Sequence, residues 1–134
     1  MLQPRQPVPA QPELVAKILW SALTGSMFLY GIILFVLGKV SAVFIPYAMR
    51  PLDYMAVFAN IVVFYVLFIH HKKVSSQTNP QKKNTLNIIC WAMNEWIVIC
   101  GFIAVFSADN GNAFFYVTNL AVGLVGNLLT FPKK

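Results

Sequence analysis

The sequence predicts an all-α membrane protein whose four transmembrane helices form two antiparallel hairpins, with both termini in the cytoplasm. Of the 134 residues, 58% are hydrophobic and only 10% are charged, too few charges to cover a soluble domain. The apolar residues also gather into stretches of about 18 to 20, long enough to cross a bilayer. The predicted spans are residues 18–38, 53–70, 87–107 and 113–131.

The polar segments divide the chain into four parts. Residues 1–17 form a cytoplasmic arm whose prolines disfavour a helix, and this arm is either a solvated tail or a docking strand for a protein partner. Residues 18–70 form the first predicted hairpin, residues 71–86 a polar cytoplasmic linker, and residues 87–134 the second hairpin. Asn110 and Gly111 predict the tight turn of this second hairpin, since both residues readily accept a positive φ.

Orientation follows from the positive charges, which are concentrated on one side of the predicted spans. Two of them, Lys39 and Arg50, lie on the other side. The eight that share one side are Arg5, Lys17, Lys72, Lys73, Lys82, Lys83, Lys133 and Lys134. The positive-inside rule therefore predicts cytoplasmic termini and a cytoplasmic linker. The net charge of +6 accordingly indicates binding to anionic lipid headgroups at the cytoplasmic face, not to nucleic acid.

The first and third spans share a short pattern at an offset of 70 residues. Each contains an alanine followed directly by leucine or methionine, then a glycine or glutamate two positions later, and a further glycine six positions after that. The matched residues are Ala22, Leu23, Gly25 and Gly31 in the first span and Ala92, Met93, Glu95 and Gly101 in the third. If the match reflects a duplication, the two repeats are parallel and related by an axis along the membrane normal.

Glu95 is the candidate functional residue, because it is the only acidic residue well inside a predicted span. A charge at that depth is costly, and an apolar environment favours the neutral form of a carboxylic acid. Glu95 is therefore predicted to take up and release a proton or to bind a cation; the alternative is a hydrogen-bonding group that links helices. Residues at similar depth are its predicted partners: Asn94, Asn119, Asn127, Thr24 and Asn60.

Small residues on the spans predict close helix packing and a homo-oligomer, since helices in lipid associate through close contact. These residues are Ser21, Gly25, Gly31, Gly101, Gly123 and Gly126. No metal site is predicted, because His70 and His71 lack further ligands nearby in the sequence. We also find no cofactor motif and no pair of nucleophile and base, so an enzyme is not expected.

The pattern Ala92-Met93-x-Glu95-x5-Gly101, with the closing Phe131-Pro132, resembles small uncharacterised four-span bacterial membrane proteins. The two predicted hairpins with a single membrane carboxylate are more loosely similar to the duplicated proteolipid subunits of rotary ATPases. That likeness implies a ring in the bacterial inner membrane whose carboxylate carries protons or sodium ions. Two features depart from the proteolipids: a glycine ladder is missing, and Glu95 lies on the third predicted span instead of the fourth.

The leading hypothesis is thus a proteolipid-like, multi-pass membrane protein that self-assembles around Glu95. A second hypothesis is a non-catalytic scaffold subunit of a membrane complex, recruited through the proline-rich arm. A third is a small proton-coupled exporter. Titration of the carboxylate separates the first and third from the second, and the size of the oligomer separates a ring from an exporter dimer.

Overall fold

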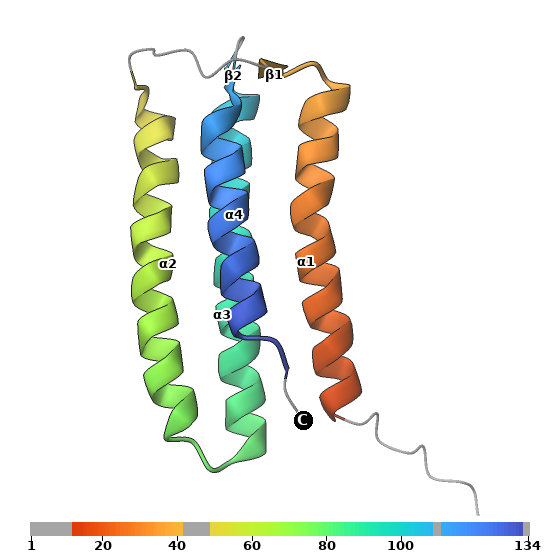
Figure 1. The fold of residues 1–134 in the computed structure, drawn as a ribbon, viewed down its shortest axis with the longest axis vertical. Coiled ribbons are helices and arrows are strands. Elements are labelled where there is room, and N and C mark those ends of the chain that lie inside the picture. The colour runs from red at the N-terminus through yellow and green to blue at the C-terminus, as the bar shows by residue number, and fades with distance from the viewer. Residues whose placement is uncertain (1–11, 42–48, 109–110, 133–134) are drawn as a thin grey trace, which may run out of the picture.

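Four helices make up almost all of the structure, a computed structural model that describes residues 12–41, 49–108 and 111–132. The helices are α1 (Pro12–Val36), α2 (Pro51–Ser75), α3 (Pro80–Phe106) and α4 (Ala113–Leu129). Two strands of two residues each, β1 (Val40–Ser41) and β2 (Gly111–Asn112), lie at one end of the bundle. Successive helices run in opposite directions (Figure 1), so α1 and α3 are parallel to each other. The predicted all-α fold is confirmed.

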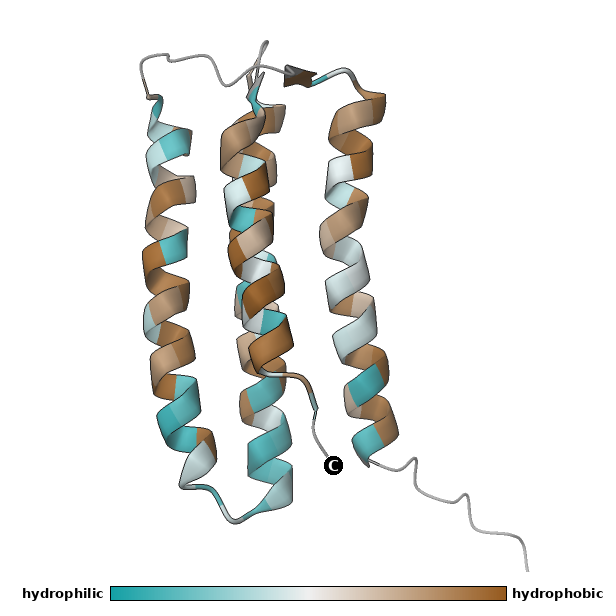
Figure 2. Cartoon of the chain, viewed as in Figure 1, coloured by the Kyte–Doolittle hydropathy of each residue, from teal (hydrophilic) through white to brown (hydrophobic). Residues whose placement is uncertain are grey.

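Three of the helices, α1, α2 and α3, are long and apolar enough to cross a membrane. In Figure 2, hydrophilic residues concentrate at the end of the bundle that holds the α2–α3 turn and the start of α1, whereas the rest of these helices is mostly apolar. This distribution fits a membrane protein. The fourth helix is also apolar but has only 17 residues, or about 26 Å of helix, so it is a little shorter than a typical hydrocarbon core.

The centre of the bundle is α3, which packs against each of the other three helices. Its most extensive contact is with α4, and the contact with α2 comes next. The remaining pair, α1 and α2, flank the α3/α4 pair from opposite sides (Figure 1) and do not pack against each other along their length. Helices α3 and α4 are thus a packed pair and α1 and α2 are not, so the predicted arrangement as two hairpins is not confirmed.

The helix ends differ from the predicted boundaries. Pro12 begins α1, because the first position of a helix needs no backbone N–H, so the arm predicted at 1–17 is helical from residue 12 onward. The linker predicted at 71–86 is wrong in its extent: α2 continues to Ser75 and α3 begins at Pro80. Asn79 caps α3 by accepting hydrogen bonds from the backbone N–H groups of Gln81 and Lys82. The predicted turn residue Asn110 lies outside the described residues.

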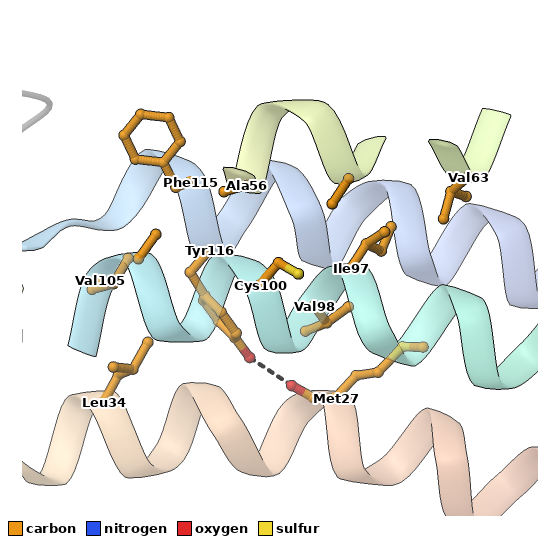
Figure 3. Packing of buried hydrophobic residues seen from close by; sticks show 12 residues of the cluster. Met27, Leu34, Ala56, Val63, Ile97, Val98, Cys100, Val105, Phe115 and Tyr116 are labelled. Atoms are coloured by element: carbon orange, nitrogen blue, oxygen red, sulfur yellow. Dashed lines mark hydrogen bonds between the residues drawn. The ribbon is translucent and has the colours of Figure 1, made fainter. Parts of the chain in front are cut away.

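The apolar core lies between α3 and its three neighbours (Figure 3). Tyr116 of α4 crosses this core, and its hydroxyl donates a hydrogen bond of 2.6 Å to the backbone oxygen of Met27 on α1. Both cysteines are free and buried on α3. The labelled members of the cluster are Met27, Leu34, Ala56, Val63, Ile97, Val98, Cys100, Val105, Phe115 and Tyr116.

An ion pair between Arg50 and Asp53 stabilises the N-terminal end of α2, which lies at the same end of the bundle as the strands. Asp53 is fully buried and accepts hydrogen bonds from the backbone N–H and the guanidinium of Arg50. The same guanidinium donates to the backbone oxygen of Ala104 on α3, at 2.6 Å. At this end β1 also pairs in parallel with β2, with Val40 opposite Gly111. The start of α2 and the end of α1 are therefore both attached to the α3/α4 pair.

The small residues predicted to pack helices divide into two groups. Four glycines lie at contacts within the chain, where an added Cβ would come within 3.0 Å of a neighbouring atom: Gly31, Gly101, Gly123 and Gly126. The other two, Ser21 and Gly25, are exposed on α1, and a Cβ at Gly25 would meet nothing within 4 Å. Gly123 faces Val98 and the backbone of Asn94, so its predicted role in assembly between copies is wrong.

This division predicts opposite outcomes for two equivalent substitutions. Gly123→Ala should lower the free energy of unfolding by about 1–3 kcal/mol, because its methyl group overlaps the α3 backbone. Gly25→Ala should stay within about 1 kcal/mol of the wild type, because the methyl group enters open space. Thermal unfolding of both variants in detergent, followed by circular dichroism, measures the difference. Equal melting temperatures would contradict the packing described.

Candidate functional site

The candidate site is the carboxyl group of Glu95, which lies between α3 and α1. It is eight residues past Asn87, or about 12 Å along the helix, and so lies within the apolar part of α3. Ser26 Oγ lies 2.5 Å from Glu95 Oε1 and 2.7 Å from the backbone oxygen of Leu23, so its single proton can be donated to only one of the two at a time, and Tyr30 Oη donates to Glu95 Oε1 at 3.1 Å. The carboxyl group is half-buried, and among the described residues it forms no ion pair.

The two hydroxyl groups reach Glu95 together because Ser26 and Tyr30 are four residues apart on α1. Residues at this spacing lie on the same face of a helix, one turn above the other. Helices α1 and α3 run side by side in the same direction, so this turn of α1, from Ser26 to Tyr30, lies next to Glu95. Both donors therefore approach one carboxyl oxygen, Oε1, while Oε2 accepts no hydrogen bond from the described residues.

None of the five predicted partners forms a hydrogen bond with Glu95 in the described part of the chain. Three of them form a separate chain of contacts across the bundle. Asn94 donates its side-chain N–H to Asn127 Oδ1 at 2.9 Å, and Asn127 donates to Thr24 Oγ1 at 2.9 Å. Asn94 precedes Glu95 directly, so its side chain points to α4 whereas that of Glu95 points to α1. These contacts link α3, α4 and α1 without involving the carboxyl group.

The other two predicted partners connect α2 to the α3/α4 pair. Asn60 donates to Asn119 Oδ1 at 2.7 Å. Asn119 is almost fully buried and donates to the backbone oxygens of Ala56 on α2 and Ile97 on α3, at 3.2 and 2.8 Å. One α4 amide thus contacts both neighbouring helices. Asn119, Gly123 and Asn127 lie at a spacing of four residues on one buried face of α4. Both amides bond to α3, and Asn119 also bonds to α2 whereas Asn127 bonds to α1.

Polar contacts also hold α1 against the bundle along its length. Within this helix only Ala16, Met27 and Leu34 are buried among the described residues. The polar contacts are more numerous. Besides those of Thr24, Ser26 and Tyr30, Trp20 Nε1 donates to the backbone oxygen of Asn127 at 2.9 Å. With the bond from Tyr116 to the Met27 backbone, these contacts form a ladder that attaches α1 to α3 and α4.

Sequence reasoning missed Ser26 and Tyr30, although a signal for both was present. The repeat aligns Gly25 with Glu95, which already places the following residue, Ser26, at the depth of the carboxyl group. A hydroxyl residue four positions further, Tyr30, completes one face. The missing information was the neighbour of that face, because spacing along one helix does not specify which helix it contacts.

Chain comparisons identify no relative for the site. No protein-family model, no curated protein and no solved structure matches the chain. In the described part of the chain, no three His, Cys, Asp or Glu side chains lie together as they would around a metal ion. The chemistry of the site is therefore argued from the contacts of Glu95 alone.

Proposed function

We propose that this chain is a four-span protein of the bacterial inner membrane, proteolipid-like and self-assembling, in which Glu95 binds and releases a proton within the bilayer. The observation that carries the proposal is the pair of hydroxyl donors on a single oxygen of an intramembrane carboxyl group. Carboxylates in membrane spans are costly and usually serve ion binding or proton transfer.

The arrangement accommodates both protonation states of Glu95. When the group is ionised, Ser26 and Tyr30 stabilise the negative charge through their hydrogen bonds to Oε1. When the group is neutral, the proton occupies Oε2, and Oε1 still accepts both hydrogen bonds as a carbonyl oxygen. Protonation therefore requires no rearrangement of α1.

The proposed orientation has both termini and the α2–α3 turn in the cytoplasm. It rests on the eight-to-two distribution of lysine and arginine in the sequence. Of the eight lysines and arginines assigned to the cytoplasmic side, Lys17 lies near the start of α1, Lys72 near the end of α2 and Lys83 near the start of α3. These three helix ends are at one end of the bundle (Figure 1), and Lys39 and Arg50 follow α1 and precede α2 at the other.

We predict that cysteines at the two ends of the bundle label from opposite sides of the membrane. Ser76→Cys, in the α2–α3 turn, should react with an impermeant maleimide only from the cytoplasmic side. Ser107→Cys, at the end of α3, should react only from the other side. The wild type serves as the control, because Cys90 and Cys100 are buried and should remain unlabelled. Labelling of both variants from the same side would contradict the four-span topology.

Self-assembly is supported by the outward face of α1. Ser21 and Gly25 are exposed there at a spacing of four residues, so they form a small-residue surface that none of the described helices covers. Such surfaces allow close approach of membrane helices. We propose this face of α1 as the contact between copies. Gly123, which the sequence analysis grouped with Gly25 among the small residues, instead faces Val98 inside the chain.

A bulky residue on this face should therefore disperse the oligomer without unfolding the monomer. Gly25→Leu is expected to shift the wild-type oligomer to monomers in native mass spectrometry, since its side chain blocks the close approach. Ile61→Ala is the control, because Ile61 is exposed on α2 at the other side of the bundle. A wild type that remains monomeric at every protein-to-lipid ratio would rule out self-assembly.

The second candidate function is a structural subunit in which Glu95 only links helices. The observation in its favour is that the hydrogen bonds of Glu95 belong to the same ladder as those of Thr24 and Trp20, which are contacts of a purely structural kind. A proton-coupled exporter remains the third alternative. It shares the titratable carboxyl group but predicts a dimer instead of a larger ring.

The decisive prediction concerns Glu95→Gln. The wild type should form one adduct with a hydrophobic carbodiimide, which attacks protonated carboxyl groups from the lipid phase, and Glu95→Gln should form none. Glu13→Gln is the control and should keep the adduct, since Glu13 is exposed at the start of α1 and bonded to Lys17.

In liposomes with an imposed pH gradient, Glu95→Gln should also abolish the proton flux of the wild type. The glutamine retains an acceptor oxygen for Ser26 and Tyr30, so the fold should persist. If the wild type carries no flux, or if Glu95→Gln carries as much as the wild type, the structural function is the correct one.

A further inference from the structure

A shallow cavity of about 640 Å³, open to the surface, lies at the turn between α2 and α3. Its lining includes Lys73 from the last turn of α2 and Lys82 from the first turn of α3. Polar side chains without formal charge, Ser76, Gln77 and Gln81, lie between the two lysines in the sequence. Two ammonium groups and two side-chain amides thus surround one space, and all of them can donate hydrogen bonds.

The positive charges at this turn have no acidic partner. Among the described residues, Lys72, Lys73, Lys82 and Lys83 form no ion pair. Lysines at the C-terminal end of α2 are favoured by the helix dipole, which explains Lys72 and Lys73. Lysines at the N-terminal end of α3 are disfavoured by the same effect, only weakly at an exposed position, so a bound anion beside Lys82 would be favourable.

An anion in the cavity would offset that unfavourable effect. The donors would be side chains, because Asn79 already accepts hydrogen bonds from the backbone N–H groups of Gln81 and Lys82. A phosphate group presents several oxygens and a negative charge, which suits two lysines with neighbouring amides.

The surroundings of the cavity identify the source of the phosphate as a lipid. Leu86 forms part of the lining on the side toward the apolar middle of the bundle. Ile89, seven residues after Lys82 and therefore on the same face of α3, is 53% exposed. A ligand with its phosphate at the lysines can therefore lay its acyl chains along exposed apolar side chains. Inorganic phosphate would leave those side chains unused.

We propose that this cavity binds the phosphate of an anionic membrane lipid, with Lys73 and Lys82 as its charged ligands. The site is local and differs from a general attraction of the cytoplasmic face for anionic lipid. Lys72 and Lys83 carry the same charge at the neighbouring positions but are not part of the lining. The proposal does not depend on the function of Glu95.

The experiment compares two double variants that lose the same charge. Dioctanoyl phosphatidylglycerol is titrated into the detergent-solubilised protein, and bound lipid is counted by native mass spectrometry. Lys73→Gln/Lys82→Gln should weaken binding by about 10- to 30-fold, on the basis of typical lysine contributions near anionic lipid. Lys72→Gln/Lys83→Gln should change it by less than about threefold. Equal melting temperatures of the two variants verify that both are folded.

Further titrations test the identity of the ligand. Dioctanoyl phosphatidylcholine, whose headgroup has no net charge, should bind the wild type at least about tenfold more weakly than the anionic lipid. Inorganic phosphate at the same concentration should not displace the anionic lipid. Equal weakening in both double variants would overturn the proposal in favour of a diffuse charge effect. Displacement by inorganic phosphate would overturn it in favour of a free anion.

Discussion

In a hydrocarbon environment, buried polar groups depend on partners within the protein, because there is no water to supply one. Among the described residues, two buried side-chain oxygens, Asn60 Oδ1 and Asn94 Oδ1, accept no hydrogen bond, although the amide nitrogens of the same residues do donate. This constraint determines how the bundle of this chain is held together. Asn119 of α4 bonds to α2 and α3, and Asn127 of α4 bonds to α1 and α3. The apolar side chains define which surfaces meet, and these amides fix which helix lies on each side of α4. Such bonds contribute about 1 kcal/mol each, so specificity of pairing is their main effect.

The constraint also explains the central position of α3. Its glycine at 101 lets Asn119 and the backbone of Phe115 approach closely, and its residue Asn94 lies against Gly126. Close approach brings side-chain amides within reach of backbone oxygens, as at Ile97. The α3/α4 pair is therefore the most closely packed part of the chain. Helix α1 attaches to this pair by fewer contacts than α2 does, which leaves the Glu95 carboxyl group at a less tightly packed boundary.

Much of the fold could be predicted from the sequence because long apolar stretches have few structural solutions in a bilayer. Helix ends were harder to predict. Lysines at 72, 73, 82 and 83 suggested a loop, but polar helix turns continue readily into water, and Pro80 with Asn79 begins α3 within that segment. The residues expected beside Glu95 were chosen by depth alone, and its hydrogen bonds go instead to Ser26 and Tyr30. Depth along a span does not specify which helix face is the neighbour.

The pairing of β1 with β2 has a mechanical consequence for α1. Val40 lies four residues after Val36, the last residue of α1, and pairs with Gly111, just before α4. The pairing therefore ties the C-terminal end of α1 to the start of α4. A rod fixed at one end can move only by pivoting, and its displacement increases with distance from the fixed point. Any tilt of α1 would therefore separate Trp20 from α4 further than it separates Tyr30 from Glu95. The carboxyl group would become accessible first from the end of the bundle at which α1 begins.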